Sequence, residues 1–139
     1  MNIHGTKIRV SYYEASDGPR LMLFGPLEAE YGRLYNLFKS LSEESISVFL
    51  NAEDFVAFFT DYTVGLTNNA SGKETGVHFD EKKQLFQWFL NKNDWLDLAD
   101  LIQGLCFNDR SGHQYLATYP DDDVTIVLSK GEYGDEVLK

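Results

Sequence analysis

Apolar residues recur at two spacings along this chain, and the two spacings follow each other twice in the same order. Residues 21–24 form an apolar run typical of a strand, and apolar residues at helical spacing follow between Tyr31 and Leu41. The run at residues 85–88 and the apolar positions between Trp95 and Leu105 repeat this arrangement. The pattern predicts a duplicated strand–helix unit, in which each helix has one apolar face that the other unit must bury.

The first unit is predicted to span residues 7–50. Residues 8–13 alternate between apolar and polar and, with a turn at residues 17–19 and the run at 21–24, predict a β-hairpin. Pro26 opens a predicted helix, with Glu28 and Glu30 close to the positive end of its dipole. We expect this helix to end between residues 42 and 45 and a buried strand to follow at residues 46–50.

The second unit is predicted to span residues 76–129. It begins with a strand at residues 77–79, a polar turn, and a strand at 85–90. A helix then starts near residues 91–94, capped by Asn91 or Asn93. Strands at residues 114–118 and 124–128 are joined by a turn of Tyr, Pro and three Asp. The polar tail from Gly131 onward is expected to be frayed.

Residues 51–76 connect the two units and have no counterpart in the repeat. Residues 55–59 (Phe-Val-Ala-Phe-Phe) are rich in aromatics and predict a short helix started by Glu53 and Asp54. Residues 67–73 predict an exposed loop. The aromatics either fill the gap between the units or line a binding site. The fold class predicted from these patterns is α+β. We expect a single domain over residues 1–139, with two pseudo-repeated, ββαβ-like strand–helix units whose helices pack on a mixed or antiparallel sheet.

Charge narrows the choice of partners. The 139 residues include 12 basic and 22 acidic residues, for a net charge of −10. Phosphates would be repelled by such a chain, so nucleic acid and anionic membranes are disfavoured and a basic protein is favoured, although solubility alone also explains an acidic composition. The sequence has no transmembrane-length apolar run, no secretory signal pattern at its start and one cysteine, so we expect a cytoplasmic protein.

Candidate reactive residues do not combine into a recognised catalytic, cofactor or metal motif. Cys106 and His113 are a conceivable nucleophile and base, but Cys106 lies at the predicted C-terminal end of a helix, where the dipole disfavours a thiolate. His4 and His78 lack the partners of a zinc site. The pair Gly72-Lys73 resembles the end of a phosphate-binding loop only superficially, because Glu follows in place of Ser or Thr. We therefore expect no enzyme activity, no cofactor and no metal.

The last third of the chain resembles a known class of proteins. Residues 112–116 (Gly-His-Gln-Tyr-Leu), 124–129 (Val-Thr-Ile-Val-Leu-Ser) and 131–133 (Gly-Glu-Tyr), in a small acidic chain, resemble the immunity proteins encoded beside bacterial polymorphic or contact-dependent toxins. The resemblance implies a stoichiometric inhibitor that occludes the active site of a cognate, often basic, toxin. It carries over no binding residue by position, since these proteins share no single motif.

The residues expected to bind such a partner come from the charge pattern. They are the outward-facing acids of the second helix and the acids of the last turn, namely Asp97, Asp100, Asp121, Asp122 and Asp123. Replacing the three turn residues with serine is expected to leave folding intact and to slow association. Two alternatives stay open. One is a small enzyme or ligand-binding domain with a pocket between the two units beneath residues 51–76, and the other is a homo-oligomeric structural protein. The chain is expected to be a monomer or a homodimer.

Overall fold

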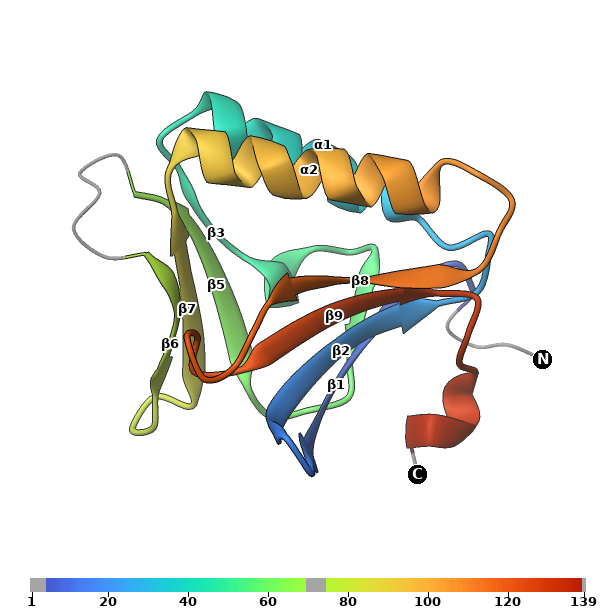
Figure 1. Cartoon of the computed structure of the whole chain (residues 1–139), viewed down its shortest axis with the longest axis horizontal. Coiled ribbons are helices and arrows are strands. Elements are labelled where there is room, and N and C mark those ends of the chain that lie inside the picture. The colour runs from blue at the N-terminus through green and yellow to red at the C-terminus, as the bar shows by residue number, and fades with distance from the viewer. Residues whose placement is uncertain (1–4, 70–74, 139) are drawn as a thin grey trace.

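The structure is a computed structural model that describes residues 5–69 and 75–138. These residues form two α-helices and two β-sheets of mixed topology (Figure 1), which confirms the α+β class. The elements follow in the order β1 (Ile8–Ala15), β2 (Gly18–Gly25), α1 (Tyr31–Glu43), β3 (Ser47–Phe49), the 3₁₀ turn η1 (Leu50–Ala52), β4 (Val56–Phe58), β5 (Thr63–Asn68), β6 (Gly76–Asp80), β7 (Leu85–Leu90), α2 (Lys92–Cys106), β8 (Gly112–Ala117), β9 (Thr125–Lys130) and the 3₁₀ turn η2 (Asp135–Leu138).

Each sheet combines strands from both halves of the chain. One sheet has five strands in the order β4-β1-β2-β9-β8, and the other has four in the order β3-β5-β7-β6. Parallel pairs join the halves, β2 with β9 in the first sheet and β5 with β7 in the second. The predicted mixed pairing is therefore right, while two sheets take the place of the single sheet that was expected. A strand pair followed by a helix does occur twice, and the descent of both from one duplicated unit stays a prediction.

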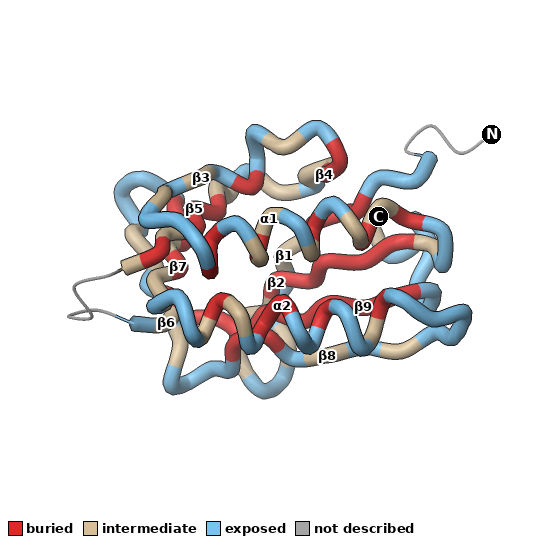
Figure 2. Tube along the Cα trace, turned by 90° about the horizontal axis from the view of Figure 1, so that it is seen from above, coloured by how far each residue is buried: buried red, intermediate tan, exposed pale blue. Residues whose placement is uncertain are grey.

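The two helices pack side by side over the sheets (Figures 1 and 2). Three aromatic rings join α1, β7 and α2: the centroid of Phe38 lies 5.7 Å from that of Trp88 and 5.2 Å from that of Trp95. The indole Nε1 of Trp95 donates to the carbonyl of Thr67 at 3.0 Å, which ties α2 to β5. Asn91 caps α2, since its side chain accepts a hydrogen bond from the Asp94 amide, as predicted.

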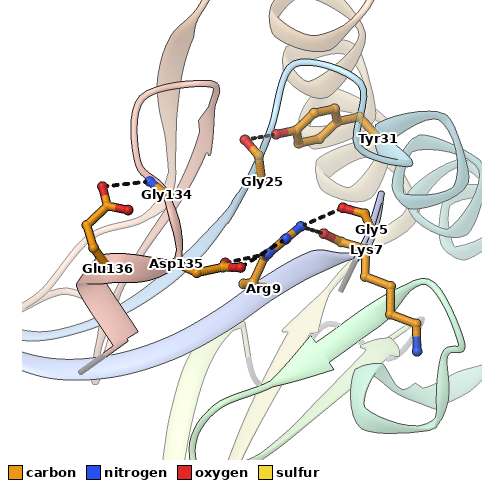
Figure 3. Close-up of polar contacts among 8 residues, drawn as sticks. All are labelled: Gly5, Lys7, Arg9, Gly25, Tyr31, Gly134, Asp135 and Glu136. Atoms are coloured by element: carbon orange, nitrogen blue, oxygen red, sulfur yellow. Dashed lines mark hydrogen bonds and ion pairs between the residues drawn. The ribbon is translucent and has the colours of Figure 1, made fainter. Parts of the chain in front are cut away.

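Helix α1 begins at Tyr31, five residues after the predicted start at Pro26. The chain before it forms a turn in which the Glu30 amide donates to the carbonyl of Thr6 at 2.8 Å. The Tyr31 hydroxyl donates to the carbonyl of Gly25 at 2.8 Å (Figure 3), so the start of the helix is held against the end of β2. Glu30 is therefore the residue before the helix, and its first turn contains no acidic residue. A proline that is compatible with a helix start is equally compatible with a turn, which is why the prediction was wrong.

The connecting segment contains strands where a helix was predicted. Residues 56–58 form β4, which pairs in parallel with β1, and β5 lies inside the four-stranded sheet. Phe55 is buried, and Tyr62 packs against Tyr12 and Phe86. These rings belong to the core, as one of the two interpretations of the segment predicted. The loop expected at residues 67–73 was wrong at its start, because Thr67 and Asn68 belong to β5, and its residues 70–73 lie outside the described residues.

Two further expectations about burial and order were wrong. The strand expected to be buried at residues 46–50 is the short edge strand β3, in which Phe49 is 54% exposed. The tail expected to be frayed contains η2, and Asp135 in this turn pairs with Arg9 of β1 at 2.8 Å (Figure 3). Strand β3 lies at the edge of a sheet and the tail lies on the outer face of one, and in both places contacts with distant parts of the chain decide burial and order.

Candidate protein-binding surface

The two acidic residues predicted on α2 are available to a partner. Asp97 and Asp100 are exposed, on the side of the helix opposite the buried Trp95, Leu98 and Ile102. Within the described part of the chain, neither carboxylate makes a hydrogen bond or an ion pair. Their charge is therefore free to act on an approaching molecule, at the low interaction energies typical of exposed groups.

The three acidic residues of the β8–β9 turn divide into two kinds. Asp121 is exposed and, in the described residues, has no side-chain partner. Asp122 accepts hydrogen bonds from the Val77 amide at 2.8 Å and the Thr118 amide at 3.1 Å. Asp123 accepts one from the Phe79 amide at 2.8 Å. Asp122 and Asp123 thus stabilise the fold as acceptors for backbone groups, which revises the expectation that both can be replaced without affecting folding.

These bonds cover the free edge of the four-stranded sheet. Strand β6 is an edge strand, and its Val77 and Phe79 amides are not used by the pairing with β7, where Val77 lies opposite Trp88. The Asp123 amide also donates to the Val77 carbonyl at 3.0 Å, so the turn pairs with β6 through both backbone and side chains. An unpaired edge invites association with other strands, and this turn removes that possibility at β6.

A different surface combines several groups suited to binding: the face of the five-stranded sheet that points away from the helices. Strand register places Ser11, Met22, Val127 and Tyr115 in one row across four strands, with Tyr13 beside Arg20 in the next row. Paired residues point to the same side of a sheet, so these side chains form one outer face.

Three neighbouring cavities follow this face and share lining residues. The largest has a volume of about 400 Å³ and is bounded by the sheet, by Phe59 and by the C-terminal segment. Tyr13 and Met22 also line the second cavity, of about 110 Å³. Arg20 and Tyr115 are shared between the second and a third of about 260 Å³. We call this continuous depression the outer-face groove, and residues 131–138, which form one of its walls, the strap.

The open part of the groove is lined by aromatic rings and one arginine. Tyr13, Tyr115 and Tyr119 are each partly exposed although they are large. The Arg20 guanidinium pairs with Asp17 at 2.9 Å and lies 5.9 Å from the centre of the Tyr115 ring. Among the described residues, the buried Nε of Arg20 has no hydrogen-bond partner.

Ser129, Glu132 and His113 form a hydrogen-bonded group beside the groove. The Ser129 hydroxyl donates to Glu132 at 2.6 Å, and the other neighbour of this carboxylate is His113 Nδ1 at 3.1 Å. In a nucleophilic triad the imidazole lies between the hydroxyl and the acid. Here the carboxylate lies in the middle and the imidazole bonds to it and not to the hydroxyl, so the arrangement is not that of a triad, and the group binds residue 132 to the sheet.

Cys106 lies on the other side of the same sheet, in the core beneath α2. Burial raises the pKa of its thiol to about 12, with the charge of Lys130 acting weakly in the opposite direction. The His113 side chain bonds to Glu132 and not to Cys106. The sequence predicted a raised pKa for this thiol because of the helix dipole. The pKa is raised, and its main cause is burial.

As one alternative, a pocket was predicted between the two units, beneath residues 51–76. A cavity of about 240 Å³ occurs beside the connecting segment, but it is formed by α1 with Glu53 and Phe55, within the first half of the chain. In residues 5–69 and 75–138 no three His, Cys, Asp or Glu side chains are grouped to hold a metal ion. No helix formed by these residues is long and apolar enough to cross a membrane. His4, Gly72 and Lys73 lie outside the described residues.

The sequence contains one indication that the outer face of the five-stranded sheet is covered. Residues 21–24 of β2 are all apolar, so both faces of this strand must be covered, whereas β1 alternates. Comparison with known proteins adds no further guide, because no protein-family model and no curated protein sequence matches this chain.

Proposed function

We propose that this protein is a non-catalytic protein-binding module that neutralises a cognate bacterial toxin, as immunity proteins do, by covering its active site. The observation that carries the proposal is the outer-face groove, a depression lined by tyrosines, phenylalanine, methionine and arginine on a chain of net charge −10. Tyr and Arg dominate the residues that contribute most binding energy in protein interfaces, where they bury large areas at low entropic cost.

The exposed acids of the chain have a separate role in this proposal. Asp97, Asp100 and Asp121 attract a basic partner over a distance and raise the rate of encounter. They lie on α2 and on the β8–β9 turn, which are two separate parts of the surface (Figure 1), so they act through the field of the whole protein more than as one contact. Asp122 and Asp123 contribute charge to that field and hold the turn in place.

The groove supplies the contacts that slow dissociation. Tyr13 and Tyr115 flank Arg20, and all three can be covered by one partner segment since they line connected cavities. The exposed part of the Arg20 guanidinium, which pairs with Asp17, loses water together with the rings when the partner binds, and this strengthens its polar contacts. A toxin held in this way is blocked by occlusion, without chemistry on either protein.

Affinity capture with matched variants tests the proposal. The tagged protein is incubated with native cell lysate at low and moderate salt, and a single basic protein is expected to be retained stoichiometrically. Tyr115→Ala should weaken that complex by about 30-fold or more, as expected for the loss of a central interface residue. Phe49→Ala is the matched control, since Phe49 is a similarly exposed aromatic (54% against 49%) on the other sheet.

The retained protein must then lose its own toxic activity when one equivalent of this protein is added. Retention that survives Tyr115→Ala unchanged, or a partner whose activity is not inhibited, contradicts the proposal. Recovery of the bait alone at dimer mass would instead support a homo-oligomer, for which the six-residue uncharged edge strand β8 is the available pairing edge.

A second candidate function is the binding of a small molecule in the largest cavity. Its volume of about 400 Å³ falls within the range of ligand sites, and Ser11 and three tyrosines supply polar atoms beside apolar walls. A thermal-shift screen of metabolites would favour this candidate if one compound raised the Tm of the wild type but not of a Tyr13→Ala variant.

A further inference from the structure

A part of the chain itself occupies one end of the outer-face groove. The strap leaves β9 at Gly131 and crosses the outer face of the five-stranded sheet to end in η2 (Figure 1). Its residues from 131 to 137 are exposed, so it lies on the sheet and not within the core. No strand of either sheet is formed by it. The strap is therefore held mainly by what its side chains contact.

Those contacts recur at every third residue. Glu132 accepts a hydrogen bond from the Ser129 hydroxyl at 2.6 Å and lies 3.1 Å from His113 Nδ1. Asp135 accepts from Arg9 Nε at 2.8 Å (Figure 3). Leu138 packs against an apolar group formed by Met22, Phe24 and Val127, on the outer face. A spacing of three residues matches the repeat of a 3₁₀ turn, which puts Asp135 and Leu138 on the same side.

The sheet presents a matching row of groups. Register aligns Arg9 with Phe24, Phe24 with Ser129 and Ser129 with His113, so one row crosses β1, β2, β9 and β8. Arg9 and Ser129 are donors at the β1 and β9 positions, His113 lies at the β8 end, and the apolar ring of Phe24 lies between them. The row thus offers a polar partner to each carboxylate of the strap at its two ends, and the strap turns back in η2 so that Leu138 reaches the apolar position between them.

The row is built for an anionic occupant. Arg9 is only 2% exposed, and its guanidinium also donates to the carbonyls of Gly5 and Lys7 (Figure 3). A buried guanidinium needs a carboxylate or an equivalent acceptor beside it, because losing one partner of a buried pair is costly. Any segment that replaces the strap must therefore bring a carboxylate to Arg9 and an apolar side chain to Phe24.

We infer that this row is a docking surface for an acidic, amphipathic segment of a partner protein, with the pattern acid, two residues, acid, two residues, aliphatic residue. The strap is its resident occupant and leaves when such a segment binds. This surface is the covered end of the groove, distinct from the open end assigned above to the basic partner. Gly131 gives the strap its turn, since its φ is +71° and a Cβ there would lie 2.8 Å from Leu27.

A peptide titration followed by amide NMR tests the inference without knowledge of the partner. The probe is the acetylated peptide of residues 131–138, Gly-Glu-Tyr-Gly-Asp-Glu-Val-Leu. The released variant carries Glu132→Gln, Asp135→Asn and Leu138→Ser, so that its own strap no longer fits. The peptide should shift amides of Met22, Phe24 and Val127 in this variant at a concentration at least about tenfold lower than in the wild type, where the tethered strap competes.

Two controls separate docking from a general effect of charge. A peptide with the same three substitutions should produce no shifts in the released variant. A protein with Asp97→Asn and Asp100→Asn, which loses the same number of charges elsewhere, should behave as the wild type. Equal titration of the wild type and the released variant, or shifts only at residues away from the row and from its apolar neighbours Met22 and Val127, would overturn the inference.

Hydrogen exchange of the unmodified protein gives a second measurement that needs no variant. The Gly131 amide donates to Gly25 at 2.8 Å and the Val137 amide to Gly134 at 3.3 Å. If the strap leaves the sheet while the core stays folded, these amides exchange at least about 100-fold faster than that of Leu128 in β9. Exchange at the rate of the core would overturn the inference, as would a dimer formed by exchange of straps between two copies.

Discussion

Two pairs of aspartates that look alike in the sequence have different roles in the structure. Asp97 and Asp100 project from α2 into solvent, and within the described residues no group bonds to them. Asp122 and Asp123 lie in the β8–β9 turn and accept backbone hydrogen bonds from β6. The first pair can act on a partner at no cost to the fold, whereas the second pair is engaged in joining one sheet to the other.

The difference arises from what surrounds each pair and not from the aspartates themselves. A carboxylate on an exposed helix face finds only water, since the helix has used its own amides. A carboxylate beside an edge strand meets amides that have no other partner, and it binds them strongly because the bond is charge-assisted. Negative charge in the sequence therefore indicates a binding surface only where the backbone has no unpaired groups nearby.

The largest effect on stability should come from Asp122→Asn. This change places an amide NH₂ against either the Val77 or the Thr118 amide, so one donor loses its acceptor while the shape is kept. We expect the free energy of unfolding to fall by about 1–3 kcal/mol, measured by urea denaturation. Asp123→Asn should cost less, since it accepts one such bond and the amide oxygen can replace it.

Asp121→Asn is the matched control for this prediction. It removes the same charge from the same turn, but Asp121 is exposed and has no side-chain partner in the described residues. Its effect should stay within about 0.5 kcal/mol. Equal effects of Asp121→Asn and Asp122→Asn would show that the charge of the turn matters and the hydrogen bonds do not.

Gly76→Ala should be the next most damaging change, because the Asp122 carboxylate that binds β6 leaves no room for a side chain at this position. Gly76 has a φ of +91°, and a Cβ there would lie 2.4 Å from Asp122 Oδ1. We expect a loss of about 1–3 kcal/mol from backbone strain and displacement of the carboxylate. In a double-mutant cycle, Gly76→Ala should cost less stability in the Asp122→Ala background than in the wild type. Equal costs in the two backgrounds would contradict this contact.

The secondary structure that the sequence predicted correctly follows local patterns. Helical spacing placed Trp95 and Ile102 inward, and Asn91 was identified as a cap because capping depends on residues only three positions away. The class of fold followed from the same patterns. Strand pairing did not, since β2 lies beside β9 and β5 beside β7, contacts between residues far apart in the chain.

Of the candidate binding surface, the sequence predicted the exposed acidic residues and not the outer-face groove. The outer-face groove depends on register between β1, β2, β8 and β9, which no local pattern encodes. The roles of Asp122 and Asp123 depend on the distant edge strand β6 and were missed for the same reason. The tail was expected to be frayed because it is polar, yet its Asp135 pairs with Arg9, a residue at the other end of the chain.

A smaller effect on stability is expected from the ionisation of Cys106, which lies on the buried face of α2, the helix that also carries Asp97 and Asp100. The Cys106 thiol has its pKa raised by burial to about 12, from 9.0 in the unstructured chain. The thiolate is the reactive form, so iodoacetamide at pH 8 should label the native protein far more slowly than the urea-unfolded protein. Because the folded pKa is the higher one, this thiol's contribution to stability is complete below about pH 9 and is lost as the pH rises to about 12.

Cys106→Ser separates this contribution from that of other groups that titrate in alkali. The wild type should lose stability relative to Cys106→Ser between about pH 9 and about pH 12, and the difference between them should be constant below pH 9. Rapid native labelling at pH 8 would show that the thiol is accessible and ionised, and would return Cys106 to the list of candidate nucleophiles.

The smallest effect on stability, and a clear effect on association, is expected for Asp97→Asn with Asp100→Asn. The change should leave the free energy of unfolding within about 0.5 kcal/mol, because neither carboxylate has a partner in the described structure. Association with the purified basic partner, followed by stopped-flow fluorescence, should slow by several-fold at low salt and little at high salt, since exposed charges act through a screened field. The dissociation rate should not change.

The control for this last change removes two charges from elsewhere on the exposed surface, by Asp61→Asn with Glu81→Gln. If only the total charge matters, both double variants slow association equally, and α2 has no special part in recognition. If α2 faces the partner during encounter, the variant at Asp97 and Asp100 is the slower of the two. An unchanged association rate at low salt in both would remove electrostatic steering from the proposed mechanism and leave the outer-face groove as the sole basis of recognition.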